Sequence, residues 1–158
     1  MEIMLTRIDD RLIHGQVAMV WTRESKCNRI LIVSDEVAND ELRKTLLKQV
    51  APQGVKTHVI TVDKMIEIYK NPKYDIFKPM LLFTNPSEVL RMVEGGVDIK
   101  SVNIGGMSYK EGKQQITSAV SVNDEDIAAF KELNKRGVEL EIRKVAKDSK
   151  VDLMSKLQ

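Results

Sequence analysis

The residues with the clearest chemical potential lie close together near the amino terminus, in the segment TRIDDRLIHGQV at residues 6–17. His14 is one of only 2 histidines in the chain, and a neutral imidazole can take up a proton or attack phosphorus. Arg11, three residues earlier, offers a planar cationic fork that suits a phosphate or a carboxylate. The two side chains together predict a site that receives an anion.

Neighbouring polar residues could support this pair. Asp9 and Asp10 could orient the arginine or the imidazole, or could cap the turn through hydrogen bonds to the backbone, and the sequence leaves both alternatives open. Arg7 lies within or at the end of the preceding strand and could reach the same site or pair with an aspartate, so it ranks second to Arg11. Gly15 and Gln16 follow the histidine at the expected start of a helix, where free backbone N–H groups favour an anion.

Two further turns carry candidate site residues. Thr84 and Asn85 can donate or accept hydrogen bonds, and the paired glycines Gly105 and Gly106 let backbone N–H groups approach an anion closely. Each turn also has a purely structural interpretation, because Asn-Pro is a common helix cap and Gly-Gly a common tight turn. The other histidine, His58, lies in an apolar segment without a companion acid or arginine, so we interpret it as structural.

The elements that position these residues follow from the apolar pattern, in which short apolar runs alternate with segments of helical spacing. The predicted strands cover residues 2–8, 29–34, 55–61, 80–83, 101–104, 116–122 and 138–145. A first helix follows Gly15, with Val17, Val20 and Trp21 on one side. Three later helices are predicted to begin after cap residues, namely Asn39, Asn85 and Asn123. Two more are predicted around residues 65–69 and over residues 149–157. The helix after Asn39 has one apolar stripe, formed by Leu42, Leu46, Leu47 and Val50.

Repeated strand-helix units predict an α/β fold of three layers, with a mostly parallel central β-sheet of about six or seven strands and helices on both faces. The loops that follow parallel strands gather at one end of the sheet, where ligands bind. A length of 158 residues predicts a single domain over residues 1–158.

Composition excludes several classes of function. The net charge is only +2 and the charges are interleaved, which argues against nucleic acid as a partner. The lone Cys27 cannot form an internal disulfide and has no neighbours at zinc spacing, so no metal site is expected. No apolar run approaches the roughly 20 residues of a spanning helix, and no signal peptide is evident, so we expect a cytoplasmic protein without direct membrane insertion.

A resemblance to a known family lies between Arg7 and Val145, in the motifs RIDDRLIHGQV, VSDEVAND, RKTLLKQVAP, LLFTNP, VNIGGM and ELEIRKV. In these motifs the chain resembles the IIB subunit of the mannose class of bacterial phosphoenolpyruvate-dependent sugar phosphotransferase systems, the class for mannose, fructose and sorbose. The resemblance implies that His14 accepts a phosphoryl group from the IIA subunit and passes it to a hexose bound by the membrane subunits IIC and IID. The activity would be that of a protein-N(pi)-phosphohistidine–sugar phosphotransferase that uses no cofactor and associates peripherally with the IIC/IID complex. Arg11 would be the companion of the phosphohistidine.

Several alternatives stay open at this level. Mannose is the first choice among several hexoses, homodimer formation is undecided, and IIA is expected on a separate polypeptide because the chain starts directly on its first strand. The rival function is a non-catalytic α/β module that binds a small anion or a nucleotide in a regulatory or interaction role, using Arg11 without phosphorylating His14. The absence of GxGxxG and GxxxxGK[ST] motifs weakens the nucleotide version of this rival.

Overall fold

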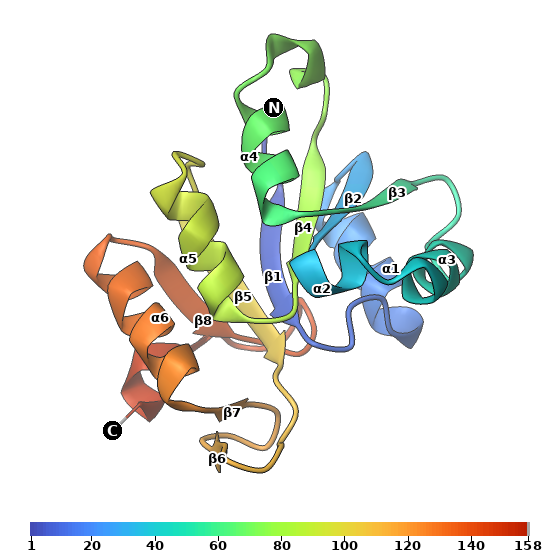
Figure 1. Ribbon diagram of the computed structural model, residues 1–158. Helices are drawn as coiled ribbons and strands as arrows, with labels where there is room; N and C mark the ends of the chain where they lie inside the picture. Colours follow the sequence, from blue (N-terminus) through green and yellow to red (C-terminus); the bar gives the residue numbers. More distant parts are fainter. Residues whose placement is uncertain (158) are drawn as a thin grey trace.

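A seven-stranded β-sheet forms the centre of the computed structural model, which describes residues 1–157 (Figure 1). Neighbouring strands follow the order β3-β2-β4-β1-β5-β8-β9, and every pair is parallel except β8 with β9. The predicted three-layer α/β fold with a mostly parallel sheet is confirmed. The strands are β1 (Leu5–Asp9), β2 (Arg29–Val33), β3 (Lys56–Ile60), β4 (Pro79–Phe83), β5 (Ser101–Gly106), β8 (Glu139–Ile142) and β9 (Val151–Asp152).

Helices connect the strands and cover both faces of the sheet. They are α1 (Gly15–Ser25), α2 (Asp35–Ala38), α3 (Glu41–Gln49), α4 (Val62–Tyr69), α5 (Pro86–Glu94) and α6 (Asp124–Lys135), with 3₁₀ turns η1 (Pro72–Tyr74) and η2 (Leu153–Lys156). The predicted caps of α5 and α6 are confirmed. The side chain of Asn85 accepts a hydrogen bond from the backbone of Glu88, and Asn123 forms a capping box with Asp126.

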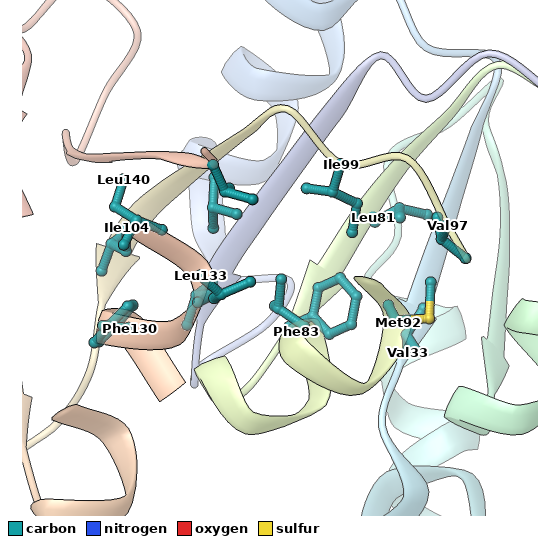
Figure 2. Packing of buried hydrophobic residues seen from close by; sticks show 14 of the residues in the cluster. Val33, Leu81, Phe83, Met92, Val97, Ile99, Ile104, Phe130, Leu133 and Leu140 are labelled. Atoms are coloured by element: carbon teal, nitrogen blue, oxygen red, sulfur yellow. The ribbon is translucent and has the colours of Figure 1, made fainter. Parts of the chain in front are cut away.

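Apolar side chains alternate between the two faces of the sheet, as the period of two in a strand requires. In β2, Leu31 and Val33 belong to one buried cluster, whereas Ile30 and Ile32 belong to another. Helices α4, α5 and α6 cover the first cluster, and α1 and α3 cover the second. Figure 2 shows part of the first cluster, including Phe130 of α6.

The second predicted helix was wrong in its start and in its buried face. Asn39 ends the short helix α2, and Asp40 is the residue whose side chain caps α3. Two helices replace one because Ser34 caps a first helix ahead of Asn39. Of the predicted apolar stripe only Leu47 is buried, because α3 packs against β3 at the edge of the sheet; the exposed members are Leu42, Leu46 and Val50.

Three predictions in the second half of the chain were also wrong. Gly105 and Gly106 do not form a turn but continue β5. Residues 116–122 are mostly irregular, and only their end forms β7 (Ser121–Val122), which pairs antiparallel with β6 (Gln114–Gln115) outside the main sheet. Residues 149–157 form β9 and η2 instead of a helix, because β9 pairs with β8 and Leu153 is buried in the first cluster.

Candidate functional site

His14 lies in the connection between β1 and α1, at the carboxyl end of the central strand. After β1 the chain continues to β2, which lies on one side of β1 in the sheet. After β4 it continues to β5, which lies on the other side of β1. The connections thus diverge at this end of the sheet, which makes it a topological switch point. His14 is exposed and has an extended backbone at the N-cap position of α1. Its imidazole makes no hydrogen bond or ion pair with any residue between positions 1 and 157 and is therefore free to react.

The start of α1 differs from the starts of the other α-helices within the described part of the chain. Each of the others has an N-cap side chain that accepts a backbone hydrogen bond, together with an acidic residue in its first turn. Helix α1 has neither feature. Its first N–H groups thus keep their capacity to bind an anion, and no local carboxylate repels one.

Asp9 fixes the position of Arg11. The carboxylate of Asp9 is 1% exposed and accepts hydrogen bonds from Nε and Nη2 of Arg11 at 3.0 Å each, as well as from the backbone N–H of Arg11 at 3.1 Å. This fork-like pairing raises the pKa of Arg11 through the hydrogen bond to Asp9. Because the side chain of Arg11 stays 36% exposed, its cationic end can still meet a ligand.

Arg7 is buried and supports the site from behind. Its Nη2 donates to Asp9 at 3.2 Å and to the carbonyl of Lys144 at 3.2 Å, and its Nη1 donates to Asn103 and to the carbonyl of Arg143. Burial lowers the pKa of Arg7, although the carboxylate of Asp9 counteracts this effect. With these partners the guanidinium is enclosed by protein, so Arg7 holds Asp9 in place and does not face an incoming anion.

Asp10 connects the loop to the segment that follows β5. Its carboxylate accepts hydrogen bonds from the backbone N–H of Ser108 at 2.7 Å and from the hydroxyl of Ser108 at 3.0 Å. Its own N–H donates to the carbonyl of Gly106 at 3.1 Å. The two aspartates therefore differ in role, since Asp9 orients the arginine and Asp10 anchors the loop.

The paired glycines make room for the two arginines. A Cβ atom on Gly105 would lie 2.0 Å from Nη2 of Arg7, and a Cβ atom on Gly106 would lie 3.1 Å from Nη2 of Arg11. At position 105 only a residue without a side chain allows the guanidinium this close to β5, whereas at position 106 a Cβ atom would require only a small shift of Arg11. Gly15 has a positive φ of 54° with open space around it, and Gln16 is exposed beside it.

Thr84 and Asn85 use their hydrogen-bonding groups locally. Asn85 accepts from the backbone of Glu88 at 2.9 Å and donates to Thr84 at 3.2 Å and to the Glu88 carboxylate at 3.1 Å. Both residues line a groove of about 510 Å³ that Asp10 also lines but His14 and Arg11 do not. The structure therefore does not bring Thr84 and Asn85 into one cavity with the histidine.

A polar network next to Arg7 escaped the sequence analysis. Glu141 is 4% exposed and accepts from Arg143 at 2.8 and 2.9 Å and from Asn103 at 3.2 Å. Arg7 and Arg143 each also lie about 5 Å from the ring of Trp21. The signal in the sequence was a polar residue next to an apolar one in each of three strands, and the register pairs Arg7 with Asn103 and Asn103 with Glu141.

Residues 1–157 contain no helix that is long and apolar enough to cross a bilayer. No group of three or more His, Cys, Asp or Glu side chains in this range is placed to hold a metal ion.

Comparison with known proteins gives consistent matches. The family model "PTS system sorbose subfamily IIB component" matches residues 3–158. The chain is 61% identical to the mannose-specific EIIAB component of Escherichia coli K12, covering 99% of this chain and 50% of that protein. It is 52% identical to the sorbose-specific EIIB component of Lacticaseibacillus casei, covering 99% and 96%. The chain thus spans half the length of the first relative and nearly all of the second.

The fold matches a solved structure equally well. The IIBSor domain of the sorbose permease from Klebsiella pneumoniae superimposes with a TM-score of 0.97 at 50% sequence identity. The match covers 99% of this chain and 96% of that one.

Proposed function

The chain belongs to the sorbose subfamily of IIB components of the sugar phosphotransferase system, and we propose that it serves there as a phosphoryl carrier through His14. In this proposal His14 receives the phosphoryl group from a IIA donor and passes it to a hexose held by the membrane subunits IIC and IID. The protein then works at the cytoplasmic side of that membrane complex as a phosphohistidine–sugar phosphotransferase.

One observation carries the proposal: the imidazole of His14 is exposed and has no structural task in the described chain. A histidine at an N-cap position could bond to the first turn, but this one does not. It stands at a helix start without an acidic residue and three residues from an arginine held in place by Asp9. These features suit a nucleophile that becomes an anion when it is phosphorylated.

The transfer consists of two in-line displacements at phosphorus. A neutral nitrogen of His14 attacks the phosphorus of the donor phosphohistidine; the new N–P bond forms while the donor N–P bond breaks and returns its electron pair to the donor imidazole. A hydroxyl oxygen of the sugar then attacks the phosphorus; the new P–O bond forms while the N–P bond breaks and returns its electron pair to neutral His14, and the hydroxyl proton passes to solvent water. Arg11 and the free N–H groups of α1 stabilise the phosphoryl oxygens in both steps.

The affinity of the loop for phosphate must stay moderate. A carrier passes its group on, so strong stabilisation of phosphohistidine would raise the barrier to the second transfer. The geometry fits this requirement because Arg11 is already neutralised in part by Asp9. The loop must also be reachable by two successive partners, and the exposure of His14 agrees with that need.

Several features of the whole system also belong to the proposal. Relatives named for mannose and for sorbose support a hexose as the final acceptor, with mannose as the first choice. The E. coli relative is named as an EIIAB component, which supports a IIA domain as the donor. A non-catalytic anion-binding module is the weaker alternative because it leaves the exposed imidazole unused.

Substitution of His14 tests the proposal directly. Wild-type protein incubated with phosphoenolpyruvate, the general phosphotransferase proteins and a IIA domain should gain the mass of one phosphoryl group, and the label should be lost in acid. His14→Ala should gain none. His58→Ala is the matched control, because His58 lies in strand β3 at the far edge of the sheet and should leave the labelling unchanged.

Two outcomes would count against the carrier. The first is absence of label on wild-type protein in the presence of an active phosphorylated IIA. The second is equal labelling of His14→Ala and wild type, which would place the phosphoryl group on another residue. Circular dichroism of both variants checks that the fold is intact.

A further inference from the structure

A cavity of about 250 Å³ lies beside the His14 loop but does not include His14 among its lining residues. Arg11, Gly105 and Gly106 form its wall towards the loop and β5, and Ser121 and Lys144 come from later parts of the chain. We propose that this cavity is a separate binding site for the phosphate group of a small phosphate ester.

The charge of the lining favours an anion. Arg11 and Lys144 are its charged residues, and no carboxylate lines the cavity. Within residues 1–157 the ammonium group of Lys144 has no hydrogen-bond or ion-pair partner, and Nη1 of Arg11 has none either, since Asp9 engages the other side-chain nitrogens. Two cations without full pairing at one cavity attract a group of high negative charge, such as a phosphate dianion.

A hydroxyl in the cavity wall adds a hydrogen-bond donor beside the two cations. Ser121 lines the cavity, and its hydroxyl donates no hydrogen bond to any residue between positions 1 and 157. Although the residue is only 2% exposed, its oxygen is not one of the buried polar atoms without a partner, so it faces the open space of the cavity. A phosphate oxygen in the cavity would accept the hydrogen bond from Ser121 while it binds the two cations.

The remaining lining fits a hydroxylated group attached to the phosphate. The cavity is larger than a phosphate group alone needs, and Tyr109, Gln115 and Ser118 contribute hydroxyl and amide groups to it. Such groups pair well with the hydroxyls of a sugar. Sugar phosphates and free phosphate share the recognised group, and binding measurements can separate the two sources.

Occupation of the cavity has a consequence that rests on the proposed carrier function. Arg11 lines the cavity and also neighbours His14 in the same loop. A phosphate bound in the cavity would compete with phosphohistidine for Arg11. Bound ester should then slow the phosphorylation of His14, although binding itself requires no phosphotransfer.

Titration of the unphosphorylated protein tests the site without any transfer activity. The probes are inorganic phosphate, a hexose monophosphate and the unphosphorylated hexose, followed by calorimetry and by fluorescence of Trp21, whose indole N–H donates to the carbonyl of Lys144 at 3.0 Å. We expect saturable binding of the first two probes and none of the hexose. Tighter binding of the ester would assign the rest of the cavity to the sugar, and equal binding would identify free phosphate as the ligand.

Matched variants locate the site. Lys144→Ala should weaken binding by about tenfold or more, because it removes a charge-assisted contact. Lys147→Ala removes the same charge from an exposed residue outside the cavity and should change affinity less than twofold. Ser121→Ala should weaken binding severalfold, whereas His14→Ala should retain it.

Three results would overturn the proposal: no saturable binding of either phosphate compound, equal losses for Lys144→Ala and Lys147→Ala, or loss of binding in His14→Ala. The first would remove the site, the second would reduce it to general charge attraction, and the third would merge it with the His14 loop. Circular dichroism of each variant ensures that a loss of binding is not a loss of fold.

Discussion

The chemistry of the loop depends on how one buried carboxylate is shared between two arginines. Asp9 is paired with Arg7 at 3.2 Å and with Arg11 at 3.0 Å. Arg7 is enclosed and Arg11 is partly exposed, so Asp9 links the arginine that is fixed in the sheet to the arginine that we propose as the phosphate ligand. The sequence named all three residues but left their division of labour open, because spacing alone does not show which guanidinium is buried.

Arg11→Lys tests whether this fork-like geometry matters for transfer. A lysine keeps the positive charge but cannot pair with both oxygens of Asp9 and bind a phosphoryl group with a third nitrogen. We expect phosphorylation of His14 to slow by about tenfold or more, as for the loss of one strong charge-assisted contact in a transition state. Rapid-quench sampling with intact-mass detection measures the rate.

A matched control for this variant lies in the last turn of α1. Arg23→Lys changes an exposed arginine of the same helix and should leave the transfer rate unchanged. If Arg11→Lys transfers at the wild-type rate, charge alone suffices and the fork geometry has no role. If the variant is unfolded in circular dichroism, the pairing with Asp9 serves mainly the fold.

At the scale of elements, the close contact between β1 and β5 is what creates the site. The sequence predicted both strands, and it predicted Gly105 and Gly106 as a turn that approaches an anion. The glycines instead extend β5 and accommodate the guanidinium groups of Arg7 and Arg11. The error has a physical origin, because a glycine pair is compatible with a turn and with a crowded strand, and only the neighbouring strand decides between them.

Gly105→Ala tests this packing. The added methyl group would lie 2.0 Å from Nη2 of Arg7, and the arginine could not move away without losing buried hydrogen bonds. We expect the free energy of unfolding to fall by about 3–5 kcal/mol, the range for disturbing a buried ion pair. Urea denaturation of the variant and the wild type measures the difference.

Gly106→Ala is the paired comparison for this prediction. Its Cβ would lie 3.1 Å from the end of Arg11, a partly exposed side chain that can shift. The loss of stability should therefore stay below about 1.5 kcal/mol, as for mild overpacking. Equal costs for the two variants would show that the packing of Arg7 against Gly105 is not special.

At the scale of the molecule, the alternation of strands and helices was predictable because buried strands and amphipathic helices leave strong periodic signals. The wrong predictions fall where apolar spacing does not report burial. Leu42, Leu46 and Val50 have the spacing of a buried stripe but are exposed, because α3 meets only the edge of the sheet. The last element pairs antiparallel with the preceding strand β8 as β9, with Ile142 opposite Val151, and a pairing of two residues leaves no periodic signal in the sequence.

We also propose that residues 1–158 form a single domain, and cooperative unfolding tests this. Trp21, the chain's 1 tryptophan, lies in the cluster beneath α1 and α3, whereas α4, α5 and α6 cover the other face of the sheet. Strands β2 and β4 supply side chains to both clusters. Loss of one face would therefore expose the other, and partial unfolding should be unfavourable.

The expected result is a single transition in urea, with the same midpoint by Trp21 fluorescence and by far-UV circular dichroism. Fluorescence follows the α1 side, and circular dichroism follows all helices, including those on the opposite face. Refolding from the denatured state should reproduce the midpoint and so establish equilibrium. Separate midpoints would contradict the single domain, because they would mean that the helices on one face of the sheet can unfold while those on the other face stay packed against β2 and β4.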